Sequence, residues 1–215
     1  MTAPSHRILL TGFGPFGQST FNPTIGAVES LAERSDVITA ILPVEYRAAT
    51  RRIRELIHDH APDAIVSLGL AEPRSTLSVE RVAINLAEAR IPDNSGYQPQ
   101  DTALADAPSP AAYFSTLPVK RLVQALADAD VPGSLSYTAG TFVCNAVMYA
   151  ALDETAGTDV LSGFIHVPQA LGHETSETTG TPLAQDTINR GVAAALDVLF
   201  STDQVSTNGN FGALQ

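Results

Sequence analysis

The sequence has no tryptophan, only one cysteine, and no apolar run long enough to cross a membrane. A single cysteine excludes an internal disulfide framework and a zinc site of clustered thiolates, and it fits the reducing cytoplasm. The N-terminus has no apolar segment behind a basic head, so we expect no signal peptide. The sequence therefore predicts a cytoplasmic protein without a membrane anchor.

Charged residues are also scarce, and most of them are acidic. Lys and Arg number 12 against 23 Asp and Glu, which gives a net charge of −11. Such a chain repels phosphate backbones, so we expect no nucleic-acid binding. Hydrophobic residues make up 44% of the 215 residues, enough for a sizeable core. We expect one domain over residues 1–200 and a polar, frayed tail over residues 201–215.

Short apolar runs alternate with helical patterns along most of the chain. Strands apolar on both faces, separated by helices, favour a largely parallel sheet covered on both sides. Residues 76–91 read as extended or as a hairpin, and residues 92–115 as a long functional or mobile loop. The expected strands are 8–11, 37–44, 64–70, 134–138 and 160–167. The expected helices start at Pro23, cover 46–60, 118–129 and 142–152, and resume at Thr181.

A glycine-rich turn follows the first expected strand. Residues 12–17 read GFGPFG, a match to the GxGxxG pattern of dinucleotide sites. Pro15 removes an N–H that phosphate would need, and Phe13 and Phe16 are bulky where a pyrophosphate would approach. Glu45, after the second strand, could still imitate the acid that binds ribose. A plain tight turn, or an apolar pocket lined by the two phenylalanines, are the other interpretations.

Cys144 and His166 occupy positions where side chains can react. Cys144 follows a glycine turn near the start of an expected helix, whose N–H groups and dipole lower a thiol pKa and can stabilise an oxyanion. His166 ends an apolar strand at the same edge of the sheet. Alternatively, Cys144 is a small buried hydrophobe and His166 a core-edge histidine bonded to backbone.

Glu80 and Arg81 interrupt an apolar extended segment. A carboxylate inside such a run needs a partner, unless the segment is an edge strand with a solvated face. Glu80, His166 and Cys144 together would supply an acid, an imidazole and a thiol, as in a cysteine acyl-transfer triad. His173 lacks the second histidine of a zinc-binding helix, so we assign no metal.

Five separate motifs in order resemble the pyroglutamyl peptidase I family, also called pyrrolidone carboxyl peptidases. The similarity extends from about Ile8 to the last expected helix. The motifs are TGFGPFG (11–17) with Asn22-Pro23, SVERVAIN (78–85) with ARIPDN (89–94), YFSTLP (113–118), TAGTFVCN (138–145) and GFIHVP (163–168).

The resemblance implies a single-domain, three-layer α/β/α sandwich with a twisted, mixed and mostly parallel sheet. It implies a cytoplasmic, cofactor-free cysteine peptidase that removes an N-terminal pyroglutamyl residue from peptides, and family members often form homo-oligomers. The catalytic residues carry over as Glu80, Cys144 and His166. The residues implied at the substrate are Phe13 and Phe16 around the pyrrolidone ring, Ile91, Phe142 and Val143 completing the pocket, Asn22 and Leu70 beside it, and Arg90 near the nucleophile.

The chain departs from the family pattern at two places. Leu70 stands where many members have a glutamine that recognises the lactam, and residues 43–46 read PVEY where many read PTVF. The departures, at Leu70 and Val44, concern specificity more than reaction type. Two other functions remain open: a non-catalytic binding protein for small ligands, and a hydrolase for a different small N-terminal acyl group.

Overall fold

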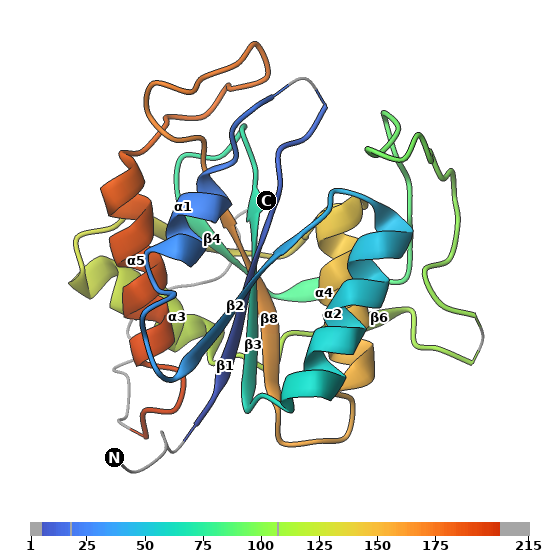
Figure 1. Ribbon diagram of the computed structural model, residues 1–215, viewed down its shortest axis with the longest axis horizontal. Coiled ribbons are helices and arrows are strands. Elements are labelled where there is room, and N and C mark those ends of the chain that lie inside the picture. Colours follow the sequence, from blue (N-terminus) through green and yellow to red (C-terminus); the bar gives the residue numbers. More distant parts are fainter. Residues whose placement is uncertain (1–5, 18, 107, 203–215) are drawn as a thin grey trace.

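A six-stranded sheet forms the centre of the computed structural model, which describes residues 6–17, 19–106 and 108–202 (Figure 1). The strands lie in the order β2-β1-β3-β8-β4-β7. The first four are parallel, whereas β4 runs antiparallel to β8 and parallel to β7. The sheet is therefore mostly parallel, as the apolar pattern predicted, and mixed, as the resemblance implied. Its strands are β1 (Ile8–Phe13), β2 (Val37–Leu42), β3 (Ala64–Leu70), β4 (Leu77–Glu80), β7 (Gly133–Ser136) and β8 (Leu161–Val167).

Helices cover both faces of this sheet and complete the three expected layers. One face carries α1 (Pro23–Glu29), α3 (Val119–Asp128) and α5 (Gln185–Asp197). The other carries α2 (Tyr46–His60) and α4 (Val143–Glu154), which pack against each other. Each interface encloses its own cluster of buried apolar side chains. Burial on both faces explains why the central strands read as continuous apolar runs.

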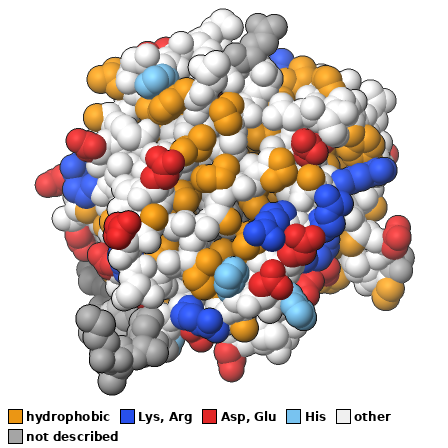
Figure 2. Space-filling view, viewed as in Figure 1, with side chains coloured by type: hydrophobic (Ala, Val, Ile, Leu, Met, Phe, Trp, Pro, Cys, Tyr) orange, Lys and Arg blue, Asp and Glu red, His pale blue; other side chains and the backbone are white. Residues whose placement is uncertain are grey.

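Local signals account for several element boundaries. Asn22 caps α1, because its side-chain oxygen accepts from the Thr24 N–H, and Pro23 follows at the first helical position. In contrast, α4 has almost no polar face, because it lies between the sheet, α2 and a small second sheet. On the outer face of α2, Arg51 and Arg52 pair with Glu55. Figure 2 shows that basic and acidic side chains lie close together on this side of the molecule.

The expectation of one extended segment or hairpin over residues 76–91 is wrong in detail. The segment breaks at Arg81 into β4 and β5 (Val82–Ile84), which do not pair with each other. Strand β5 pairs instead with β6 (Ala112–Phe114), inside the expected long loop. Buried Asp93 also ties that loop down by accepting from the backbone N–H groups of Tyr46, Ser95 and Tyr97.

The last helix begins at Gln185, four residues later than Thr181-Pro182 suggested. Leu183 is held extended, because its N–H donates to Gln169 and its carbonyl accepts from Leu171. Of the expected polar tail, residues 203–215 lie outside the described residues. In the part of the chain that the structure describes, no helix is long and apolar enough to cross a membrane.

Candidate active site

Glu80, Cys144 and His166 converge where β4, β8 and α4 meet. Glu80 is the last residue of β4, His166 lies near the end of β8, and Cys144 stands in the first turn of α4. Ser78 pairs with His166 in the antiparallel register. Because side chains two residues apart on a strand share a face, Glu80 projects from the same face as His166. The antiparallel β4 thus brings a distant carboxylate to the end of a parallel strand.

A buried hydrogen bond joins the carboxylate to the imidazole. His166 Nδ1 lies 2.7 Å from Glu80 Oε1, and the two residues are 5% and 0% exposed. With Nδ1 donating to the carboxylate, the neutral ring carries its acceptor lone pair on Nε2. A neutral His166 can therefore accept a proton from a neighbouring thiol.

Gly69 brings the thiol close to this pair. It is the sheet neighbour of His166 in the register of β3 and β8. A Cβ atom on Gly69 would lie 2.8 Å from Cys144 Sγ and 2.7 Å from the Phe164 ring. The missing side chain leaves the space that the sulfur occupies, beside the histidine strand. Only glycine fits here without displacing the thiol.

The surroundings keep both reacting groups uncharged at neutral pH. Burial, followed by the charge of Glu80, raises the pKa of the Cys144 thiol to about 12. Burial also lowers the pKa of His166, against the opposing effect of its hydrogen bond to Glu80. The free site therefore holds a neutral thiol and a neutral imidazole, and the thiol pKa is raised where the helix start was expected to lower it.

The start of α4 supplies hydrogen-bond donors beside Cys144. Phe142 is the N-cap residue and forms no side-chain cap. The first N–H groups of a helix have no partner within the helix, and they carry the positive end of its dipole. An oxyanion formed at a carbonyl attacked by Cys144 would meet these donors.

Aromatic side chains stand on one side of this arrangement. Phe142 packs edge-on against Phe16 and Tyr46, each with a centroid distance of 5.3 Å. Phe164, which sequence reasoning did not single out, stands between Phe13 at 6.5 Å and His166 at 4.8 Å. The structure thus brings Phe13, Phe16 and Phe142 into the neighbourhood of the triad.

Asn22 supports the loop that carries the two phenylalanines. Its amide nitrogen donates to the Gly14 carbonyl, and its oxygen accepts from the N–H and hydroxyl of Thr24. The Phe13 N–H donates to Thr24 Oγ1, and a Cβ on Gly12 would lie 2.9 Å from that oxygen. Gly12 therefore permits the close packing of β1 against α1, and the Phe13 N–H is not free for phosphate.

The remaining expected residues are less closely tied to the triad. Arg90 is exposed, and its guanidinium pairs with Glu177 at 3.3 Å. Ile91 is 40% exposed, whereas Val143 is completely buried in the core beneath the helix start. Leu70 is half-buried at the end of β3, one residue beyond Gly69 and beside Val167.

Sequence reasoning missed Arg74, whose Nη1 lies 2.7 Å from Glu80 Oε1. The signal in the sequence is a basic residue in the loop just before a strand that ends in a glutamate. Recognising the contact requires the strand order, which the sequence does not state. Among the residues that the structure describes, no group of three His, Cys, Asp or Glu could hold a metal ion.

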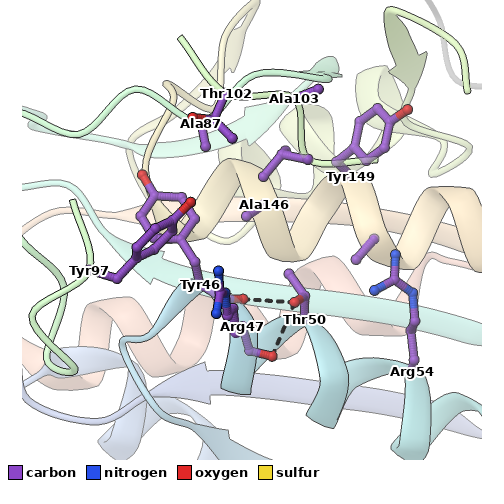
Figure 3. Close-up of a pocket in the computed structure, with 12 residues that line it drawn as sticks. Tyr46, Arg47, Thr50, Arg54, Ala87, Tyr97, Thr102, Ala103, Ala146 and Tyr149 are labelled. Atoms are coloured by element: carbon purple, nitrogen blue, oxygen red, sulfur yellow. Dashed lines mark hydrogen bonds between the residues drawn. The ribbon is translucent and has the colours of Figure 1, made fainter. Parts of the chain in front are cut away.

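A cavity of about 260 Å³ lies beside α2 and α4, separate from the triad (Figure 3). Its lining includes Tyr46, Arg47, Tyr97 and Tyr149, but none of the three candidate catalytic residues. Tyr46 lines this cavity and also contacts Phe142, so its ring connects the two regions.

A thiol at a helix start, with an imidazole oriented by a buried carboxylate, defines the class of cysteine hydrolases. Comparison with known proteins places the chain within that class. Residues 6–202 match the family described as pyroglutamyl peptidase. The chain belongs to the pyroglutamyl peptidase family.

Curated relatives and solved structures agree with this assignment. The pyrrolidone-carboxylate peptidase of Thermococcus kodakarensis is 42% identical over 200 residues, which cover 90% of this chain and 96% of the relative. The Bacillus subtilis pyrrolidone-carboxylate peptidase is 38% identical, with coverage of 94% and 97%. The crystal structure of pyroglutamyl peptidase I from Bacillus amyloliquefaciens superposes with a TM-score of 0.87 at 37% identity, covering 94% of this chain and 99% of that one.

We predict that Gly69→Ala impairs the site without unfolding the protein, because the new methyl group must displace Cys144 Sγ or the Phe164 ring. Misplacing a reacting group by about 1 Å can cost on the order of 10²-fold in rate, so we expect a loss of that order in kcat. The matched control is Gly191→Ala in α5, where the added Cβ meets Leu77 at 2.7 Å. The control should lower thermal stability and leave kcat per folded molecule unchanged. Equal kcat in Gly69→Ala and wild type would contradict the assigned position of the sulfur.

Proposed function

We propose that this chain hydrolyses the amide bond that follows an N-terminal pyroglutamyl residue of peptides. The observation that carries the proposal is the buried hydrogen bond between Glu80 and His166, beside a thiol seated over Gly69. Membership of the pyroglutamyl peptidase family supports the choice of substrate. A non-catalytic binding protein would have no need for a carboxylate that orients the imidazole beside a thiol.

The reaction follows from the positions of these groups. Cys144 Sγ attacks the pyroglutamyl carbonyl carbon, and its proton passes to His166 Nε2. The N–H groups at the start of α4 stabilise the oxyanion. The C–N bond then breaks, and His166 returns the proton to the leaving amine. Water, deprotonated by His166, hydrolyses the thioester, releases pyroglutamate and restores the thiol.

We infer that the pyrrolidone ring binds beside the thiol against the apolar side chains of Phe13, Phe16 and Phe142, with exposed Ile91 completing the contact. A lactam has no charged amine and fits such surroundings, whereas a free N-terminal residue would bring in an ammonium group without a partner. Asn22 acts indirectly, by holding the loop of Phe13 and Phe16. For Arg90 we assign no step, because its guanidinium is used in the ion pair with Glu177.

We also place this activity in the cytoplasm, where a catalytic thiol stays reduced. We also propose that this chain forms homo-oligomers, as members of the family often do.

The test is hydrolysis of a chromogenic pyroglutamyl amide by the purified protein, with iodoacetamide labelling of its single thiol. We expect turnover in the wild type, inactivation with one label per chain, and loss of turnover in Cys144→Ala. Prolyl and acetylated amino-acid amides of the same chromophore serve as matched substrates. Absence of pyroglutamyl hydrolysis by the folded wild type would refute the proposed substrate. Near-normal turnover in Cys144→Ala would refute the nucleophile.

We propose that the leucine at position 70 relaxes recognition of the lactam. A side-chain amide there could bond the lactam N–H or C=O, and such a neutral hydrogen bond contributes about 0.5–1.5 kcal/mol net. We predict that Leu70→Gln increases the preference for a pyroglutamyl amide over a cyclopentanecarbonyl amide by roughly two- to tenfold in the ratio of kcat/KM, as that energy implies. An unchanged ratio in a folded, active Leu70→Gln protein would show that residue 70 does not contact the ring.

A further inference from the structure

Arg74 lies in the loop between β3 and β4 and reaches the triad from outside the sheet. Its Nη1 lies 2.7 Å from Glu80 Oε1, the same oxygen that accepts from His166 Nδ1. Its Nη2 donates to the Thr138 carbonyl at 3.2 Å. The guanidinium therefore connects the catalytic carboxylate to the segment that leads into α4 and Cys144.

The burial of Glu80 makes such a partner necessary. The carboxylate is 0% exposed, and its second oxygen has no hydrogen-bond partner among the described residues. An ionised carboxylate in the interior is costly unless a cation and hydrogen bonds compensate for the lost water. A neutral His166 supplies one hydrogen bond but no charge. Arg74, with a side chain 25% exposed, supplies the positive charge.

The loop between β3 and β4, which carries Arg74, is held by the loop that follows β8. Figure 1 shows these two loops at the top of the molecule. The Gly180 N–H donates to the Glu72 carbonyl, and the Thr181 N–H donates to Ser75 Oγ at 2.7 Å. Gly180 packs so closely on the backbone of Arg74 that an added Cβ would overlap it. The guanidinium thus extends from a fixed support and is only partly open to solvent.

Three side chains bear on the charge around the reacting sulfur and imidazole: Glu80 from β4, Arg74 from its loop, and Tyr46 from α2. The Glu80 carboxylate raises the pKa of both Cys144 and His166, whereas the Arg74 cation lowers both. The phenol of Tyr46 stays protonated, because burial raises its pKa. Without Arg74, thiol and imidazole would both hold protons more tightly.

We propose that Arg74 is a positioning residue of this active site: its guanidinium balances the buried Glu80 carboxylate and holds it against His166, which leaves the imidazole uncharged and able to accept the thiol proton. The proposal rests on the proposed function, because it assigns Arg74 a part in the same reaction. A lysine at position 74 would retain the positive charge but could not contact Glu80 and the Thr138 carbonyl at the same time.

The test compares wild type with Arg74→Met, Arg74→Lys and the control Arg34→Met. Arg34 is 29% exposed and pairs with Asp36 and Asp197 near the amino ends of the strands, so its loss removes a similar ion pair far from the thiol. Two pH profiles are measured: kcat/KM for a chromogenic pyroglutamyl amide, and the rate of Cys144 alkylation by iodoacetamide. The second needs no substrate, so it reports on Arg74 even if the proposed substrate is wrong.

In Arg74→Met we expect the acid limb of both profiles to move to higher pH. If neutral pH falls on the acid limb, kcat/KM measured at neutral pH should fall about tenfold for each pH unit by which the limb moves. Arg74→Lys should keep the limb near its wild-type position, and Arg34→Met should leave both profiles unchanged. A variant that is merely destabilised would lose signal equally at all pH values. If the methionine variant does not fold, Arg74→Gln replaces it, with the same displacement expected. Unmoved profiles in a folded neutral variant would overturn the proposal.

Discussion

A fully buried carboxylate is the constraint around which this active site is organised. The cost of burying an ionised group is several kcal/mol, as an order of magnitude, unless partners compensate for it. Glu80 meets an imidazole on one side and a guanidinium on the other, both through the same oxygen and both at 2.7 Å. The pairing that makes the charge tolerable is also the pairing that orients His166. The stability of the buried charge and the orientation of the imidazole therefore depend on the same carboxylate oxygen.

The mixed sheet is what makes this arrangement possible. In a purely parallel sheet, the last residues of neighbouring strands lie at one edge. Here β4 runs antiparallel to β8, so the end of β4 lies opposite the middle of β8, and Glu80 is fully buried against His166. The parallel β3 on the other side contributes Gly69, whose missing side chain admits the sulfur. One strand orients the base and the other makes room for the nucleophile.

The predictable part of the structure is the part that local chemistry determines. Asn22-Pro23 starts α1 as its local chemistry predicts, and both α2 and β3 have the predicted bounds. Cys144, His166 and Glu80 each had a local signal: a helix start, a polar strand end, and a charge in an apolar run. Their convergence required the family resemblance, because the antiparallel direction of β4 is not encoded in spacing.

What could not be predicted depends on contacts between distant segments. Strands β5 and β6 have three residues each, too few to show a period, and they pair across a long loop. Thr181-Pro182 has the form of a helix start, yet Leu183 pairs with the segment after β8 and delays α5 to Gln185. The roles of Arg74 and Gly69 depend on neighbouring residues that only the tertiary structure brings into contact with them.

Glu80, His166 and Cys144 are expected to act in catalysis as one unit. The most direct measurement is a double-mutant cycle of Glu80→Gln and His166→Ala, with kcat determined for folded protein on a pyroglutamyl amide. Residues that act as one unit are strongly non-additive: His166→Ala should cost on the order of 10³-fold or more, and Glu80→Gln should add less than about threefold to it. If the two losses multiply as independent effects, the account of a single Glu80–His166–Cys144 unit is contradicted.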